Sequence, residues 1–337
     1  MTAKKSQKKP KTAKKMKIVC LGGGNLMPKV ILEPLKKYPV GLVGITSMVD
    51  NGGAYSVFRQ QFNVLPTGDI RRHVLALSNA PKWKKQLWTF RFGNETFGAN
   101  TWHKGQNFAN AFIAGLEWNL KDYRKVLNII TEFMELGTNQ ALPMIIDKTD
   151  VCAELENGQI IEGEREIELC ENHDSNLKIK KIFQKPESRI FPEAKRAILV
   201  ADLILIGPGD LYTSIAPCFL AKDAAVTFKK AKGKKILICN TVARKGETHG
   251  FSIGKFASEV EKYMGSPLDY VLYHNKPLNM DLLSVFQKDD PHIGGPLAID
   301  NDLPKDKFIG KDIYKKDEFA YDPKKVIANI FKIIGKK

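Results

Sequence analysis

Turns rich in glycine, Asp or Asn follow four apolar runs of the sequence, and these turns are the first candidates for chemistry. Glycine allows the backbone to approach a ligand closely, and the N-terminus of a following helix attracts anions. One such turn is weak evidence, because most glycines after strands only form turns. Four of them predict a ligand with phosphate groups, above all a nucleotide. The turns are Gly22-Gly23-Gly24-Asn25, Asp50-Asn51-Gly52-Gly53, Gly207-Pro208-Gly209-Asp210 and Asn240-Thr241.

Several sequence motifs of known chemistry are absent. Gly22-Gly23-Gly24 fits neither the G-x-G-x-x-G pattern of dinucleotide-binding proteins nor the G-K-[ST] of a P-loop. The six histidines have no metal-binding spacing, and the G-x-S-x-G elbow of serine hydrolases does not occur. We therefore assign no catalytic and no metal-ligating residue. A Mg²⁺ ion held mainly by nucleotide phosphates needs only one or two carboxylates, for which Asp50 and Asp210 are the candidates.

A second polar cluster, Gly68-Asp69-Ile70-Arg71-Arg72, has two interpretations. In the first, the arginines clamp a diphosphate while Asp69 holds ribose or a metal ion. In the second, Asp69 caps the start of a helix and both arginines are solvated, and residue types alone favour this interpretation. Glu247 and Thr248 also have two interpretations. Either they reach the ligand site from the turn after Asn240, or they belong to an ordinary polar turn.

Strands and helices alternate along the chain in the order that a parallel sheet requires. Strand, glycine turn, helix and strand follow one another from Lys17 to Val49, which is typical of a βαβ unit. The apolar runs are continuous, as in strands that are buried on both faces. We predict an α/β fold that closes with a helix over 322–334, and we leave the polar segment 279–321 unassigned. The predicted strands lie at 18–21, 40–49, 202–206, 235–240 and 269–275.

Residues 142–171 depart from this pattern. Two short apolar runs flank Asn157-Gly158, a dipeptide that supplies the positive φ angles of a tight hairpin turn. We predict that this acidic stretch is a small antiparallel β insertion.

Charge is distributed unevenly along the 337 residues, whose formal net charge is +16. Eight lysines and no acidic residue occur in residues 1–17, so half of the excess charge lies in a segment too polar to fold. We predict that residues 1–16 form a disordered lysine-rich tail, which either contacts an acidic partner or nucleic acid weakly or is simply solvated. The five scattered cysteines indicate a reducing cytoplasm, and no apolar run approaches the roughly 20 residues of a membrane span.

The motifs taken together resemble a known family. The most specific segments are 64–71 (Val-Leu-Pro-Thr-Gly-Asp-Ile-Arg), 201–214 (which contains Gly207-Pro208-Gly209-Asp210-Leu211-Tyr212-Thr213-Ser214) and 246–250 (Gly-Glu-Thr-His-Gly). The hairpin at 153–158 agrees with them. From about residue 16 to residue 331 the chain resembles the gluconeogenesis factors, the nucleotide-sugar-binding branch of the 2-phospho-L-lactate transferase superfamily.

The resemblance implies a fold and a function. The fold is a Rossmann-like three-layer α/β/α domain over 17–335, with a mostly parallel central sheet and a small antiparallel β insertion. The function is that of a cytoplasmic regulatory protein that binds UDP-sugars such as UDP-N-acetylglucosamine and influences carbon metabolism, cell-wall precursor supply and cell shape. Catalysis and a required cofactor are not expected, and self-association as a homo-oligomer is left open. The alternative is a transferase that moves a phospholactyl-type group from a nucleotide-activated donor with Mg²⁺.

The resemblance also implies the ligand-binding residues. In the family, the four turns surround the nucleotide: backbone N–H groups of 22–25 and 207–209 would hold the diphosphate, Asp50 and Asn240 would contact ribose or sugar hydroxyls, and Asn110 would line the pocket. Asp210 replaces the family's usual serine and adds negative charge. The full set is Gly22, Gly23, Gly24, Asn25, Asp50, Asn51, Gly52, Gly53, Asp69, Arg71, Asn110, Gly207, Pro208, Gly209, Asp210, Tyr212, Thr213, Ser214, Asn240 and Thr241.

Overall fold

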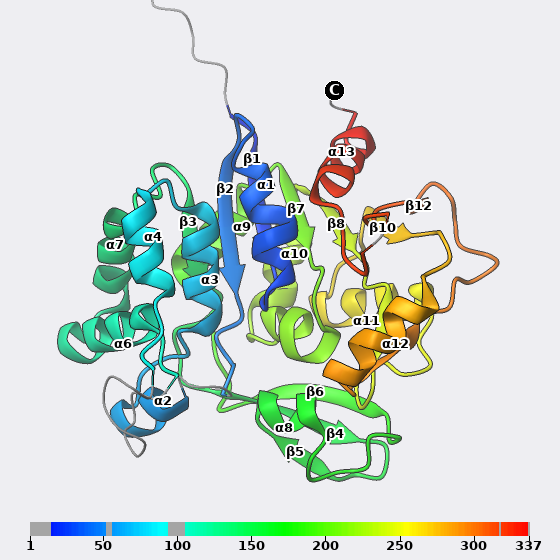
Figure 1. Ribbon diagram of the computed structural model, residues 1–337, viewed down its shortest axis with the longest axis horizontal. Coiled ribbons are helices and arrows are strands. Elements are labelled where there is room, and N and C mark those ends of the chain that lie inside the picture. The colour runs from blue at the N-terminus through cyan, green and yellow to red at the C-terminus, as the bar shows by residue number, and fades with distance from the viewer. Residues whose placement is uncertain (1–14, 52–55, 94–104, 317, 336–337) are drawn as a thin grey trace, which may run out of the picture.

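The computed structural model of the chain describes residues 15–51, 56–93, 105–316 and 318–335. A seven-stranded sheet forms its centre, and all neighbouring strands of this sheet are parallel (Figure 1). The predicted α/β fold is confirmed. In order across the sheet, the strands are β12 (Phe308–Lys311), β10 (Tyr270–His274), β8 (Lys234–Ile238), β7 (Leu203–Ile206), β1 (Lys17–Leu21), β2 (Gly41–Thr46) and β3 (Gln140–Pro143).

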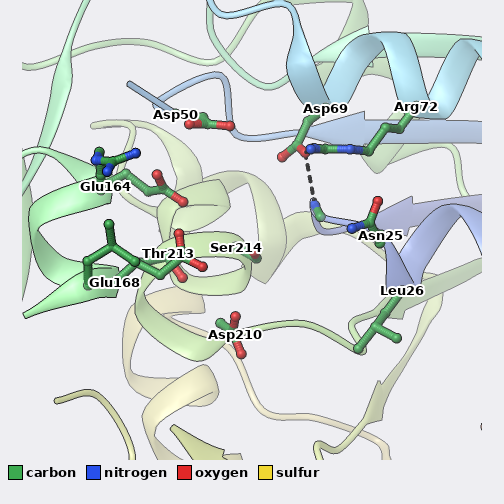
Figure 2. Close-up of a pocket in the computed structure, with 13 residues that line it drawn as sticks. Asn25, Leu26, Asp50, Asp69, Arg72, Glu164, Glu168, Asp210, Thr213 and Ser214 are labelled. Carbon is green, nitrogen blue, oxygen red and sulfur yellow. Dashed lines mark hydrogen bonds and ion pairs between the residues drawn. The ribbon is translucent and has the colours of Figure 1, made fainter. Parts of the chain in front are cut away.

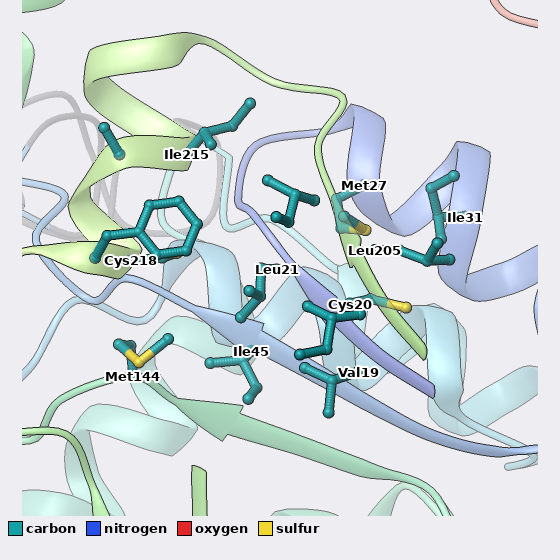
Figure 3. Packing of buried hydrophobic residues seen from close by; sticks show 14 of the residues in the cluster. Val19, Cys20, Leu21, Met27, Ile31, Ile45, Met144, Leu205, Ile215 and Cys218 are labelled. Carbon is teal, nitrogen blue, oxygen red and sulfur yellow. The ribbon is translucent and has the colours of Figure 1, made fainter. Parts of the chain in front are cut away.

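The central strands are buried on both faces. No residue of β7, whose sequence is Leu-Ile-Leu-Ile, is more than 1% exposed. β1 lies between β2 and β7, with Leu21 opposite Ile45 on one side and Ile206 on the other. Figure 3 shows Leu21 and Ile45 among further apolar side chains, including Met144 and Ile215. The continuous apolar runs of the sequence correspond to this burial.

Helices cover both faces of the sheet. The helices are η1 (Met27–Leu32), α1 (Glu33–Leu35), α2 (Ser56–Phe62), α3 (Gly68–Leu77), α4 (Lys82–Thr89), α6 (Phe108–Leu120), α7 (Tyr123–Phe133), α8 (Glu164–Leu169), α9 (Pro192–Leu199), η2 (Leu211–Ile215), η3 (Ala216–Phe219), α10 (Ala224–Lys230), α11 (Ile253–Met264), α12 (Met280–Asp289) and α13 (Pro323–Ile333). On one face η1 packs against α3 and α13, and on the other α10 packs against α9 and α11 (Figure 1). The result is the expected three-layer Rossmann-like arrangement.

A small antiparallel sheet lies beside the edge at which the parallel strands end (Figure 1). Its strands are β5 (Ile160–Glu162), β4 (Asp150–Leu155) and β6 (Ile179–Lys185), in that order. The hairpin around Asn157-Gly158 is present as β4 and β5. The predicted bounds 142–171 need correction, because residue 142 belongs to β3 of the central sheet and β6 adds a third strand. The sequence did not reveal β6, since its lysine-rich pattern has no nearby turn that pairs it with β4.

The segment left unassigned, 279–321, contains α12 and two strands. β11 (Ile293–Pro296) pairs antiparallel with β9 (Val242–Arg244), and β12 completes the central sheet. Both strands are short and contain glycine, so by sequence they resemble turns. No helix in the described part of the chain is long and apolar enough to cross a membrane. The predicted tail, 1–16, lies outside the described residues except for its last two positions.

Candidate functional site

The central sheet has a topological switch point at β1. The sheet grows from β1 through β2 to β3, and the chain then continues on the other side of β1 with β7. Open α/β sheets bind ligands at such points, outside the carboxyl ends of the strands. A cavity of about 410 Å³ lies there, and we call it the switch-point cavity (Figure 2). It is lined by Gly24, Asn25, Leu26, Asp50, Asp69, Arg72, Glu164, Arg165, Glu168, Leu169, Asp210, Thr213 and Ser214.

The turn after β1 is held by a carboxylate from α3. Oδ1 of Asp69 accepts a hydrogen bond from the N–H of Gly24 at 2.9 Å and forms an ion pair with Arg72 (Figure 2). A Cβ atom at Gly23 would lie 2.0 Å from Oδ2 of Asp69, so the close approach requires glycine. The N-cap of α3 is Thr67. The interpretation of Asp69 as a helix cap is therefore wrong, because its carboxylate holds the β1 turn instead.

The turn after β7 is held by two side chains from the segment that follows β8. Oδ1 of Asn240 accepts a hydrogen bond from the N–H of Gly209 at 3.0 Å. Glu247, which is 1% exposed, accepts bonds from the N–H of Tyr212 at 3.0 Å and from the hydroxyl of Thr213 at 3.3 Å. Asn240 and Glu247 thus shape the loop that lines the cavity and are not themselves among its lining residues.

The expected role of the glycine N–H groups needs correction. Four of the groups that were expected to hold a diphosphate already donate to protein oxygens: Gly22 to Ile45, Gly24 to Asp69, Gly207 to Leu21 and Gly209 to Asn240. Pro208 has no N–H group. Hydrogen bonds within the protein therefore build these turns, and of the expected groups the N–H of Gly23 and that of Asn25 remain as candidate donors to a phosphate.

Both turns lead into π-helical segments. η1 begins at Met27, shortly after the β1 turn, and η2 begins at Leu211, directly after the β7 turn. π-Helical turns are rare and are frequent at functional sites. Their position on both sides of the switch point agrees with a binding site there.

Helix α8 of the antiparallel insertion forms a third wall of the cavity, and the sequence did not predict it. Its residues Glu164, Arg165 and Glu168 line the cavity. Figure 2 shows Glu164 and Glu168 opposite Asn25. The Oδ1 of Asn51 accepts a hydrogen bond from the N–H of Arg165 at 3.0 Å and so fixes the start of α8. The spacing of the two glutamates, four residues apart on one helical face, was the available signal. Nothing along the sequence indicated that this helix folds against the sheet edge.

Carboxylates dominate the charge of the switch-point cavity. Five acidic side chains line it against two arginines. Burial, the neighbouring Asp50 and Glu168 raise the pKa of Glu164 well above its usual range. Partial burial also raises the pKa of Asp210, with a further contribution from Asp290. The cavity therefore retains protons at pH values at which isolated carboxyl groups are ionised.

One arginine balances the carboxylates behind the cavity. Arg244, at the end of β9, lies 3.0 Å from Glu168, 3.1 Å from Asp290, 3.7 Å from Glu247 and 3.9 Å from Asp210. Burial alone would lower its pKa, but these four carboxylates raise it above the ordinary value. Through these ion pairs Arg244 connects α8, the turn after β7 and the C-terminal end of α12.

Seven of the predicted residues line the cavity, namely Gly24, Asn25, Asp50, Asp69, Asp210, Thr213 and Ser214. The other predicted residues are not among those that line the cavity. Asn110 lies buried in α6, and Arg71 lies in α3. The rest belong to the turns or contact them, namely Gly22, Gly23, Asn51, Gly207, Pro208, Gly209, Tyr212, Asn240 and Thr241. Gly52 and Gly53 lie outside the described residues. The cavity residues that the predicted set lacked are Leu26, Arg72, Glu164, Arg165, Glu168 and Leu169.

Two buried side chains of α3 lie away from the cavity. Arg71 is 8% exposed, which excludes the interpretation that both arginines are solvated. His73 is fully buried, and this burial lowers the pKa of its imidazole to about 4. A Cβ atom at Gly44 of β2 would lie 2.7 Å from Nδ1 of His73, so the ring occupies the space that this glycine leaves.

Among the described residues, no three or more His, Cys, Asp or Glu are grouped so that they could hold a metal ion. A cation in the cavity would thus take most of its ligands from a bound phosphate and from water. One or two carboxylates, such as Asp50 and Asp210, suffice for Mg²⁺ in that case.

Comparisons with known proteins agree with this architecture. The profile of the family described as 2-phospho-L-lactate transferase CofD matches residues 18–307. A putative gluconeogenesis factor of Thermoanaerobacterium thermosulfurigenes is 30% identical over 305 residues, which cover 90% of each chain. The gluconeogenesis factor of Bacillus subtilis is 28% identical over 325 residues, 93% of this chain and 96% of its own. A crystal structure of a UPF0052 family protein from Bacillus halodurans superposes with a TM-score of 0.83 at 25% identity, covering 95% of this chain and all of that one.

The fold and the site thus define a Rossmann-like α/β protein with a cavity, lined mainly by charged and polar side chains, at its switch point. The chain belongs to the CofD family, and proteins named gluconeogenesis factors are among its relatives within it. The family that the sequence motifs resembled is confirmed.

Proposed function

We propose that this chain is a regulatory protein of the gluconeogenesis factor type that binds a UDP-sugar, such as UDP-N-acetylglucosamine, in the switch-point cavity. In this role it would couple the level of a nucleotide sugar to carbon metabolism, cell-wall precursor supply and cell shape. One observation carries the proposal: hydrogen-bond acceptors from α8, α3 and the turns after β2 and β7 converge where open α/β sheets bind nucleotides.

The polar groups of the cavity suit a ligand rich in hydroxyl groups. Ribose and a hexose offer many O–H donors, and the carboxyl groups of Asp50, Glu164 and Asp210 supply acceptors. Arg72 and Arg165 are the cations that line the cavity and would face the diphosphate. A Mg²⁺ ion that enters with the diphosphate would offset the remaining negative charge.

Thermal unfolding of the full chain with UDP-N-acetylglucosamine, UDP-glucose and GDP, each with and without Mg²⁺, tests the proposal. A ligand at 100 times its Kd stabilises the folded state by about 2.7 kcal/mol. Asp50→Asn should weaken the UDP-sugar about tenfold, because one bidentate acceptor becomes a mixed donor and acceptor. Asp289→Asn, at the exposed end of α12, is the control and should leave binding unchanged. If none of the nucleotides stabilises the protein, the proposal fails.

A second candidate function is group transfer from a nucleotide-activated donor. The printed description of the matching family is that of a transferase, and carboxylates of the cavity offer ligands for Mg²⁺. In this case a mixture of guanylated phospholactate-type donor and deazaflavin acceptor would release nucleotide in the presence of Mg²⁺. Asp50→Ala and Asp210→Ala should abolish that release. Nucleotide binding without turnover would exclude this candidate and retain the first.

A further inference from the structure

A second pocket, of about 460 Å³, lies on the other side of Asn25 and Arg72, between η1, α3 and α4. We call it the basic pocket. Six cationic side chains line it, and Glu33 is the one acidic residue in its lining. The six are Lys29, Lys36, Arg71, Arg72, Lys85 and Arg91.

Arg71 is the most buried cation of the basic pocket, and one nitrogen of its guanidinium is unsatisfied. Arg71 is 8% exposed, and its Nε has no hydrogen-bond acceptor in the described part of the chain. Its backbone carbonyl accepts a bond from Nε1 of the buried Trp88, which fixes the backbone at this point. A buried N–H group without an acceptor is costly, because burial removes its hydration and no protein group replaces it.

The other cations of the pocket do not relieve this charge. Nζ of Lys36 donates to the carbonyl of Ser78, and Arg91 donates to the carbonyl of Gly105. Burial, together with Arg72 and Arg91, lowers the pKa of Arg71 to about 10. Burial and then Lys85 lower the pKa of Lys36. Arg71 still carries its charge at pH 7, and the neighbouring cations Arg72 and Arg91 repel it.

We propose that the basic pocket is a second binding site of this protein, for a small molecule that carries at least two negative charges on phosphate groups. The planar guanidinium of Arg71 matches two phosphate oxygens, and Lys36, Lys85 and Lys29 neutralise further charge around it. The volume suits a pyrophosphate or the phosphorylated end of a metabolite. This site does not rest on the function proposed above, because it lies outside the switch-point cavity and has the opposite charge.

Isothermal titration of the full chain with inorganic pyrophosphate, without Mg²⁺ and at a fixed ionic strength set with NaCl, tests the proposal. Wild-type protein should bind pyrophosphate, and inorganic phosphate more weakly. Arg71→Gln should weaken pyrophosphate at least tenfold. Arg196→Gln removes the same charge from the exposed side of α9 and should change the affinity less than twofold. Equal affinities of these two variants, or no binding to the wild type, would overturn the proposal.

Two further arms complete the experiment. Lys85→Gln, at the partly exposed rim, should weaken pyrophosphate severalfold and provides a second test if Arg71→Gln does not fold. Titration in the presence of saturating UDP-N-acetylglucosamine should leave pyrophosphate binding intact. Competition between the two would mean that the phosphates of the nucleotide themselves fill the basic pocket. The proposal of a separate site would then be wrong. Loss of pyrophosphate binding in Arg165→Gln but not in Arg71→Gln would place the anion in the switch-point cavity and also contradict the proposal.

Discussion

Two pockets of similar volume lie on either side of Asn25 and Arg72, and their charges are opposite. Carboxylates dominate the switch-point cavity, and lysines and arginines dominate the basic pocket. Helix α3 contributes to both. Asp69 and Arg71 are two positions apart, about 200° around a helix, so one short motif sends an acid to one pocket and a cation to the other. Arg72, three positions after Asp69, lies on the same side of α3 as Asp69, with which it forms an ion pair.

The two pockets differ in how they relieve repulsion between like charges. Carboxyl groups can keep a proton, and the raised pKa of Glu164 shows that burial and Asp50 favour this in the switch-point cavity. The cavity also has Arg244 behind it, which pairs with four carboxylates. Arginine cannot lose its proton near neutral pH, and Nε of Arg71 has no acceptor among the described residues. The acidic side can therefore relieve its repulsion without a ligand, whereas on the basic side the proposed external anion would do so.

Loss of Arg244 should have the largest effect on stability. Arg244→Ala leaves Glu168, Glu247 and their neighbours without a cation in a mostly buried place, and removal of one partner of such a pair costs about 3–5 kcal/mol. Urea unfolding at pH 7, followed by far-UV circular dichroism, measures the free energy. Arg196→Ala should cost under about 0.5 kcal/mol, as is usual for exposed positions. A cost below about 1 kcal/mol for Arg244→Ala would mean that the carboxylates already hold enough protons to balance themselves.

Helix α3, which contributes residues to both pockets, should be sensitive to acid through His73, which is buried against β2. Its folded-state pKa of about 4 lies below the unfolded value of 6.5, so the unfolded chain binds the proton more readily. Stability from this residue is fully present above pH 6.5 and is lost as the pH falls toward 4, by up to about 3 kcal/mol. The free energy of unfolding, measured by urea from pH 7 to pH 4.5, should fall less steeply in His73→Phe than in the wild type. Parallel slopes in the two proteins would show that His73 accepts the proton while folded.

Arg71 should behave in the opposite way to Arg244. In a buffer without phosphate or sulfate, Arg71→Met removes a buried charge whose Nε is unsatisfied and should leave the free energy of unfolding unchanged or raise it by about 1 kcal/mol. The thioether keeps part of the apolar contact of the arginine stem. Thermal unfolding of both proteins with and without pyrophosphate tests the anion binding, since pyrophosphate should stabilise the wild type alone. If Arg71→Met lowers the free energy of unfolding by more than about 2 kcal/mol, the guanidinium stabilises the fold.

The sequence predicted the central sheet better than the site, and the reason lies in the range of the interactions. Strands such as β7 are continuous apolar runs followed by glycine turns, so each can be recognised locally. The position of Asp50 and Asp210 at the cavity follows from the common edge of parallel strands. By contrast, Glu164 and Glu168 reach the cavity because the β4–β6 sheet folds beside that edge, and no local pattern specifies this. Likewise, the glycine N–H groups seemed free until Asp69 and Asn240, far away in sequence, proved to be their acceptors.

The effect that is smallest at acidic pH, and that grows as the pH rises, concerns the proton in the switch-point cavity. Glu164→Gln replaces a protonated carboxyl by an amide of the same shape, so the two proteins should differ by only about 0.4 kcal/mol at pH 4.5. Because the folded-state pKa of Glu164 is raised, the unfolded wild type loses its proton first as the pH rises. The wild type should then lose stability relative to Glu164→Gln between pH 4.5 and the raised folded-state pKa. Urea unfolding at pH 4.5, 6 and 7.5 measures this difference, and Asp289→Asn, at an exposed acidic position, should show no such trend. A constant difference across this range would mean that Glu164 is ionised in the folded protein, and the switch-point cavity would then, like the basic pocket, require a counterion from outside.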